Sequence, residues 1–141
     1  MTETRIINLP KISDKRGTLS FFENCAQIPF EIKRIYWIYE ETLSEEARIG
    51  YACKTTDEFI VALSGSFNVT SDNGREKSTF SLNRSYYGLY TPRMTWLEMC
   101  DFSTNSLALI VSSTGHVTDD HIHDYDEFLT LKGKNDERIE H

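Results

Sequence analysis

The sequence predicts an all-β domain, a jelly-roll barrel of about eight or more short strands that ends in a short helix. Two observations lead to this prediction. Segments rich in β-branched and aromatic residues follow one another along the 141 residues, with turn signals at short intervals. Helical spacing of apolar residues occurs only after Val117. We expect a single domain over residues 1–141, with roughly the last ten residues as a frayed tail.

The first strand segments are 17–23, which follows a turn-like SDKRG, and 32–40. In the second segment, alternation assigns successive side chains to opposite faces. One face is expected to carry Ile32, Arg34, Tyr36 and Ile38, and the other Lys33, Ile35, Trp37 and Tyr39.

The segment 58–72 predicts two strands broken at Gly65, and Asn73-Gly74 predicts a type I′ hairpin turn after them. Further strands are expected at 86–92, 95–100 and 107–113. The helix is predicted from the spacing of Ile122, Tyr125, Phe128 and Leu129.

Composition limits the classes of function. The formal net charge of −7 disfavours nucleic acid as a partner, although a few arginines could still bind one small anion. No apolar run is long enough to cross a membrane and the first residues lack a signal-peptide core, so we expect a cytoplasmic protein. The cysteines, Cys25, Cys53 and Cys100, have no CxxC spacing and are expected to stay reduced.

The segment 48–67 has the spacing of the first cupin motif, in which two histidines flank one residue and a glutamate and a glycine follow. Here Tyr51 and Cys53 occupy the histidine positions, while Glu58 and Gly65 match. The second cupin motif is represented by residues 88–98. Its expected positions are Gly88, Pro92, Met94 and Leu97, of which the glycine and proline match and Leu97 replaces the third histidine.

With these ligands replaced, Glu58 and Cys53 alone do not close a metal site, and we expect no metal and no cofactor. The histidines lie near the C-terminus and are interpreted as surface residues: His116, His121, His123 and His141. Two residues apart on a helix, His121 and His123 would not share a face.

Seven stretches carry a resemblance to one family, and they cover nearly the whole chain in order: DKRGTLSFFE, IPFEIKRIYWIY, FIVALSGSFNV, DNGREKSTFSL, RSYYGLYTP, DFSTNSLALIVSS and DYDEF. The sequence resembles the dTDP-4-keto-6-deoxyglucose 3,4-ketoisomerases, or WxcM-like cupins. The resemblance implies an RmlC-like cupin fold, a homodimer and a dTDP-sugar ligand. It also implies transfer of a keto group from C4 to C3 in deoxysugar biosynthesis for bacterial surface glycans such as O-antigen or S-layer. Those enzymes generally have His-Ala-His at residues 51–53.

The candidate catalytic residues are Tyr51, Cys53, Glu58 and Tyr36. A phenol is mostly protonated at neutral pH, so Tyr51 suits an acid better than a base, and a thiolate of Cys53 could be favoured by a nearby arginine. The alternative is that Tyr51 and Cys53 only fill the barrel. Glu58 is either a base whose pKa burial raises, or a hydrogen-bonded acid that holds Arg48 or another arginine.

The candidate substrate-binding residues are Arg16, Arg34, Arg48, Tyr86 and Trp96. The resemblance places Arg16 and either Arg34 or Arg48 at the diphosphate, which guanidinium groups bind well. Tyr36 shares a predicted strand face with Arg34. Tyr86 and Trp96 offer apolar surface to a sugar or base, with core packing as the alternative.

The leading hypothesis is therefore a metal-independent 3,4-ketoisomerase that acts as a homodimer on a dTDP-4-keto-6-deoxyhexose. Two alternatives remain open at this stage. One is a catalytically silent cupin that binds a nucleotide sugar or regulates a partner enzyme. The other is a related isomerase or epimerase acting on another keto sugar.

Overall fold

The computed structural model describes residues 3–39, 49–115 and 119–140, which form short strands and one C-terminal helix. Their bounds are β1 Arg5–Asn8, β2 Lys11–Asp14, β3 Gly17–Ser20, β4 Arg34–Tyr39, β5 Ile49–Cys53, β6 Glu58–Ser64, β7 Phe67–Asp72, β8 Lys77–Leu82, β9 Tyr87–Thr91, β10 Trp96–Cys100, β11 Leu107–Ser112, β12 His121–Ile122 and α1 Tyr125–Glu140. The helix therefore includes most of the segment that the sequence analysis treated as a tail. No described helix is long and apolar enough to cross a membrane.

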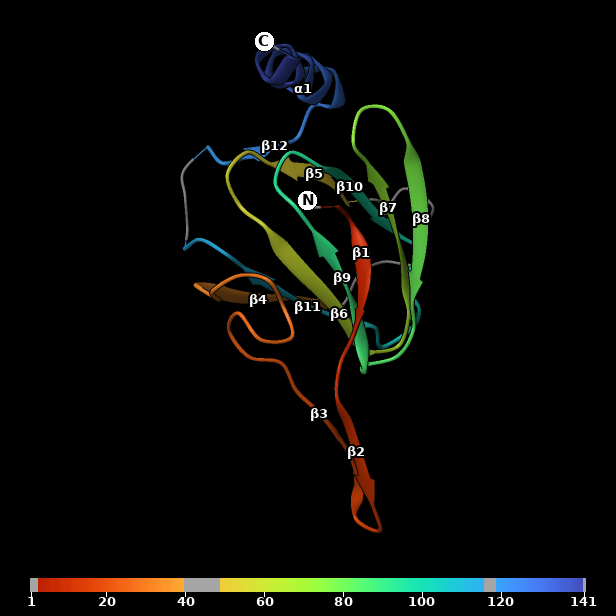
Figure 1. Cartoon of the computed structure of the whole chain (residues 1–141). Helices are drawn as coiled ribbons and strands as arrows, with labels where there is room; N and C mark the ends of the chain where they lie inside the picture. Colours follow the sequence, from red (N-terminus) through yellow and green to blue (C-terminus); the bar gives the residue numbers. More distant parts are fainter. Residues whose placement is uncertain (1–2, 40–48, 116–118, 141) are drawn as a thin grey trace.

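Two antiparallel five-stranded sheets face each other (Figure 1). The first has the order β1-β9-β6-β11-β4 and the second β12-β5-β10-β7-β8. The hairpin of β2 and β3 pairs only with itself among the described strands and projects away from both sheets (Figure 1).

Strand alternation builds the main core between the sheets. On β6, Ile60 and Ala62 face inward, whereas Phe59 and Val61 belong to a second cluster on the outer side. Apolar side chains from the facing sheet, among them Leu97 and Met99 of β10, complete the inner cluster. Because neighbouring residues of β6 are buried on both faces, the strand is nearly continuously apolar after Glu58.

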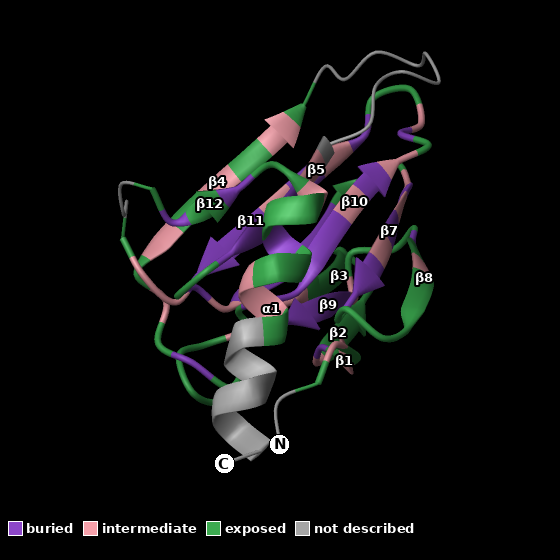
Figure 2. Cartoon of the chain, turned by 90° about the horizontal axis from the view of Figure 1, so that it is seen from above, coloured by how far each residue is buried: buried purple, intermediate pink, exposed green. Residues whose placement is uncertain are grey.

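Each outer face has its own cover. The loop that leads into β4 supplies Ile28 and Phe30 to the outer face of the first sheet. The helix covers the second sheet, as Figure 2 shows, and Phe128 packs there with Trp96 and Ile122. The outer face of β10 is therefore part of the packing of α1, whereas its inner face lines the space between the sheets.

The predicted all-β jelly roll with a single C-terminal helix is confirmed, but the sheets of the described chain are not hydrogen-bonded into a closed barrel. The predicted break at Gly65 is also confirmed. Gly65 has a φ of +67°, and a Cβ there would lie 2.5 Å from the Ser103 hydroxyl. Only glycine meets both requirements without strain.

Two predictions of local structure are wrong. The hairpin after β7 has a four-residue loop in place of a type I′ turn, because the Asn73 side chain accepts hydrogen bonds from the amides of Arg75 and Glu76 at 2.9 Å. Ile122 is not helical: it lies in β12, paired with Ala52, where it is buried against the helix. Tertiary packing thus overrides the helical spacing at Ile122, and the helix begins only at Tyr125.

Gly88 provides a test of the core packing, because an added Cβ would lie 2.5 Å from the Phe59 ring and 2.6 Å from the Ile60 carbonyl oxygen. We expect Gly88→Ala to lower the free energy of unfolding by about 1–3 kcal/mol through overpacking. Urea titration followed by tryptophan fluorescence measures this change.

The matched control is Gly133→Ala in α1, where a Cβ would meet nothing within 4 Å. Helix propensity predicts no loss there and a gain of up to about 1 kcal/mol. Equal stability of the Gly88→Ala variant and the unmodified protein would contradict the close contact between β9 and β6.

Candidate functional site

Glu58 is the centre of a buried polar cluster between the two sheets. Its carboxylate is only 1% exposed and accepts hydrogen bonds from the hydroxyls of Tyr36 at 2.6 Å, Tyr51 at 2.7 Å and Ser112 at 3.1 Å. The donors come from β4, β5 and β11, so the cluster joins one sheet to the other. Three hydroxyl donors satisfy a buried carboxylate in a way that one partner could not.

Strand register brings these groups together. Ser112 of β11 pairs with Arg34 of β4 on one side and with Glu58 of β6 on the other. Tyr36 follows Arg34 by two residues and therefore points to the same side, as the alternation of 32–40 predicted. Tyr51 arrives from the opposite sheet, next to Leu97 of β10.

Both phenols are held in the protonated form. Burial, followed by the charge of Glu58, raises the pKa of Tyr36 far above its usual value. The same two causes raise the pKa of Tyr51. The two tyrosines are therefore hydrogen-bond donors at neutral pH, which agrees with the sequence argument that Tyr51 suits an acid better than a base.

Cys53 is also a protonated thiol. Burial is the main cause that raises its pKa, and the charges of Glu58 and Asp120 add to the effect. Arg34 acts in the opposite direction, as the sequence analysis supposed of a nearby arginine, but it does not overcome burial. Cys53 is thus a poor candidate for a base in this arrangement.

Arg34 has an unusual environment for a charged side chain. Its guanidinium carbon lies 4.9 Å from the centre of the Tyr36 ring. Its Nε atom is buried and has no hydrogen-bond partner within the described residues. A buried donor without a partner costs about 1–3 kcal/mol, and an anion that accepts a hydrogen bond from this Nε would offset that cost.

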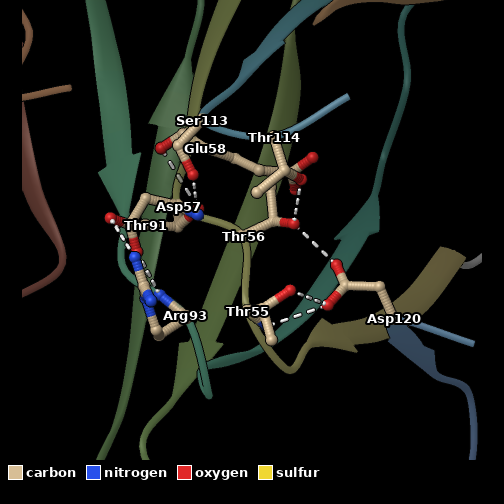
Figure 3. Close-up of polar contacts among 9 residues, drawn as sticks. All are labelled: Thr55, Thr56, Asp57, Glu58, Thr91, Arg93, Ser113, Thr114 and Asp120. Carbon is tan, nitrogen blue, oxygen red and sulfur yellow. Dashed lines mark hydrogen bonds and ion pairs between the residues drawn. The ribbon is translucent and has the colours of Figure 1, made fainter. Parts of the chain in front are cut away.

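A second polar network fixes the short strand β12 beside β5. The Asp120 carboxylate accepts hydrogen bonds from the Thr55 amide at 2.8 Å, the Thr55 hydroxyl at 2.6 Å and the Thr56 hydroxyl at 2.7 Å, as seen in Figure 3. Burial alone would raise the pKa of Asp120, but these hydrogen bonds outweigh it and hold the pKa below its usual value. The network places the residue that follows, His121, opposite Cys53.

His121 lies at the edge of the Glu58 cluster, and the sequence analysis missed it. Its ring lies 5.3 Å from that of Tyr51, and the rings of His121 and His123 are 5.8 Å apart. The prediction assigned both histidines to a helix, on which they would not share a face. It is wrong because His121 lies in β12 and His123 directly follows that strand. A two-residue strand gives no periodic signal from which the sequence could have shown this. His116 and His141 lie outside the described residues.

One group of side chains among the described residues has the ligand types and the spacing of a metal site, and it consists of Cys53, Asp120 and His121. One potential ligand atom from each lies within 4.8 Å of the other two. The oxygens of Asp120, however, already accept three hydrogen bonds, and Cys53 is held as a thiol. Since a zinc ion needs deprotonated and available ligands, the donor set fits a hydrogen-bonded cluster better than a metal centre.

The remaining predicted site residues lie elsewhere. Trp96 is on the opposite face of its sheet from Tyr51, in the cluster under α1. Its position therefore agrees with core packing, the alternative to ligand binding in the sequence analysis. Tyr86 contacts Lys11, whose Nζ lies 4.4 Å from the ring centre. Arg16 is bound to Asp14 at the tip of the projecting hairpin, with its side chain 91% exposed. Arg48 lies outside the described residues.

Comparison with known proteins gives a consistent result. A family model described as "FdtA: WxcM-like, C-terminal" matches residues 2–133. The TDP-4-oxo-6-deoxy-α-D-glucose-3,4-oxoisomerase of Aneurinibacillus thermoaerophilus is 37% identical over 126 residues, which cover 89% of this chain and 90% of that protein.

Solved structures show the same likeness. The WlaRB TDP-quinovose 3,4-ketoisomerase of Campylobacter jejuni superimposes with a TM-score of 0.86 at 34% identity, covering 92% of this chain and 99% of that one. A histidine-to-asparagine variant of the 3,4-ketoisomerase QdtA of Thermoanaerobacterium thermosaccharolyticum, in complex with TDP-4-keto-6-deoxyglucose, gives a TM-score of 0.88 at 28% identity. It covers 95% of this chain and 96% of that one.

The hydrogen bond from Tyr51 provides a test of the Glu58 cluster. We expect Tyr51→Phe to lower the free energy of unfolding by about 1.5–3 kcal/mol, because a buried charged acceptor loses one of its donors. Urea denaturation measures the loss. Tyr39→Phe on the exposed side of β4 is the matched control and is expected to change stability little. If the two variants were equally stable, the Tyr51 hydroxyl would not be a significant support of Glu58.

Proposed function

Because the chain belongs to the family described as FdtA, WxcM-like, we propose that it is a TDP-sugar 3,4-ketoisomerase of deoxysugar biosynthesis. In this proposal it moves the keto group of a TDP-4-keto-6-deoxyhexose from C4 to C3. The observation that carries the proposal is the buried Glu58 cluster beside Arg34, in a fold shared over nearly the full chain with 3,4-ketoisomerases. The product would enter the synthesis of bacterial surface glycans.

The cluster suits this reaction. Moving the keto group requires a hydrogen to leave C3, an enediol or enediolate to form, and a hydrogen to arrive at C4. Tyr36 and Tyr51 each carry a single O–H proton, which is donated to Glu58 in this structure. In this proposal each phenol turns that proton to a substrate oxygen on which negative charge develops. We therefore assign hydrogen bonding to the two tyrosines and their positioning to Glu58, while Cys53 packs beside them.

Arg34 is the cation that we assign to ligand binding. Its buried Nε has no partner in the described part of the chain, and a guanidinium binds phosphate or an oxyanion through paired hydrogen bonds. A single cation of this kind is compatible with a net charge of −7, which disfavours nucleic acid. The ligand class that we propose is thus a small TDP-linked sugar.

We also propose that the reaction needs no metal, because the cluster of Cys53, Asp120 and His121 is already hydrogen-bonded and holds a protonated thiol. The three cysteines are free, which is compatible with a reducing compartment, and we propose that the protein acts in the cytoplasm.

The proposed reaction can be tested directly. The purified protein is incubated with TDP-4-keto-6-deoxyglucose in D₂O after dialysis against EDTA, and NMR follows the sugar. We expect conversion to the 3-keto isomer with deuterium at C4, and no loss of rate on metal removal. A thermal-shift titration with TDP is run in parallel, since a ligand that binds the folded state raises the unfolding temperature.

The two measurements separate the candidate functions. Stabilisation by TDP without turnover would favour a catalytically silent nucleotide-sugar-binding protein, which the protonated Tyr51 and Cys53 make the strongest alternative. Turnover of a different TDP-keto sugar from a panel would indicate a related isomerase. Absence of both binding and turnover would overturn the proposal.

We propose in addition that the protein is a homodimer. The outer side of β4 exposes Ile35, Trp37 and Tyr39, and the projecting hairpin exposes Ile12 and Leu19. With Trp37 and Ile12 both 57% exposed, these surfaces gain from burial in an interface, and β4 is also the edge of its sheet. In such a dimer Arg16, at the hairpin tip, would meet the second subunit and not its own sheets.

Light scattering after size-exclusion chromatography tests the dimer. We expect the unmodified protein to be dimeric, and Trp37→Glu to raise the dissociation constant at least about thirtyfold, as the loss of an interface hot spot of about 2 kcal/mol would. Leu129→Glu, a partly exposed leucine on α1, is the control and should remain dimeric. A monomeric unmodified protein at micromolar concentration would refute this part of the proposal.

A further inference from the structure

The Glu58 cluster contains donors but lacks an evident proton acceptor. Tyr36 and Tyr51 donate to Glu58, and burial keeps both of them and Cys53 protonated. Glu58 already accepts three hydroxyl hydrogen bonds and is almost inaccessible to solvent. A reaction that takes a proton from carbon needs a base that is free to receive it. The required group must therefore come from beside the cluster.

His121 meets this requirement by type and position. Imidazole is the side chain whose ordinary titration lies nearest to neutrality, and its free ring nitrogen can accept a proton. The His121 ring lies against that of Tyr51, and one of its nitrogens lies within 4.8 Å of the Cys53 sulfur. In the β12–β5 pairing His121 is directly opposite Cys53, so its side chain projects from the same face of the sheet as Tyr51 and Cys53.

The position of His121 is built into the fold. Asp120 precedes it and is bound through both carboxylate oxygens to Thr55 and Thr56 (Figure 3). The amide of Lys54 also donates to the Asp120 carbonyl at 2.9 Å. On the other side, Ile122 is buried under α1. Between these two anchors, the exposed imidazole is held over the edge of the cluster.

We propose that His121 is the catalytic base that carries the proton between C3 and C4, an assignment that rests on the proposed 3,4-ketoisomerase function. The neutral imidazole takes the proton from C3, the C3–H electron pair forms the C3=C4 double bond, and O4 becomes an oxyanion. The O3 proton passes to the adjacent O4, which leaves the charge on O3. The imidazolium then returns a proton to C4 as the C3 carbonyl forms. No oxidant or further reactant is required.

Exposure of the imidazole has a measurable consequence. Because the imidazolium is in contact with solvent, its proton exchanges with water before it is returned to carbon. In D₂O we expect deuterium at C4 of the product and also at C3 of the recovered substrate. A buried base would return the original hydrogen to a large extent.

The test compares His121→Ala with His123→Ala, which serves as the matched control because His123 is a neighbouring exposed histidine to which the proposal gives no part in proton transfer. His121→Ala is expected to lose turnover about a hundredfold or more, the usual contribution of a general base, while its affinity for TDP stays within about twofold. His123→Ala is expected to keep turnover within about twofold. Added imidazole should restore part of the activity of the His121→Ala variant and should not change the activity of the His123→Ala variant.

A readout that a merely structural role would not produce is the pH dependence of this rescue. The restored rate should follow the free-base fraction of the added imidazole, and not its total concentration. The groups that face this position among the described residues are Tyr51 and Cys53 from β5 and Asp120 and His123 from the segment of His121 itself. If His121→Ala fails to fold, His121→Asn replaces it, with thermal unfolding as the check.

The outcomes keep the two proposals separate. Turnover of His121→Ala within twofold of the unmodified protein would overturn the role of His121 and leave the ketoisomerase function standing. Loss of TDP affinity in His121→Ala, without rescue by imidazole, would also overturn it. An inactive unmodified protein would instead refute the proposed function itself.

Discussion

The structure depends on one buried charge, the carboxylate of Glu58, which three hydroxyl groups from β4, β5 and β11 compensate. A carboxylate in this position would be strongly unfavourable without donors, because the apolar core between the sheets cannot solvate it. Each donor therefore has to be delivered by a strand in correct register. The same requirement connects the two sheets at this end, where the described chain has no hydrogen-bonded ladder between them.

Burial of the site is the main cause that favours the neutral forms of Tyr36, Tyr51 and Cys53. The charge on Glu58 adds to this effect at all three groups. Arg34 is the cation in reach that opposes this effect at Cys53, and its buried Nε has no partner among the described residues. The resulting site is rich in donors. Its hydroxyl donors are directed at Glu58, and in the proposed reaction proton removal from carbon is assigned to a group outside the cluster.

Much of this site could be predicted from sequence, because it depends on local rules. The alternation in 32–40 places Arg34 and Tyr36 on one face, and the motif spacing singles out Tyr51, Cys53 and Glu58. The features that could not be predicted are those that only tertiary pairing determines. Trp96 could face either side of its strand, and burial under α1 decides the outcome. The hairpin that carries Arg16 gives no sign in sequence that it projects from the sheets.

The strand β12 shows why His121 could not be identified as a site residue from the sequence. A two-residue strand is too short to have a recognisable period, and it exists here only because Asp120 is bound to Thr55 and Thr56 and Ile122 is buried. None of these contacts is local in sequence, since Asp120 lies 65 residues from Thr55. Because β12 is anchored in this way, packing in the core and proton transfer can be assigned to different strands. A histidine in the core strand β5 would have to do both. The core strand keeps neutral residues that pack and donate, whereas the exposed imidazole of His121 lies at the surface, where a positive charge would be solvated by water and would not be buried next to Glu58.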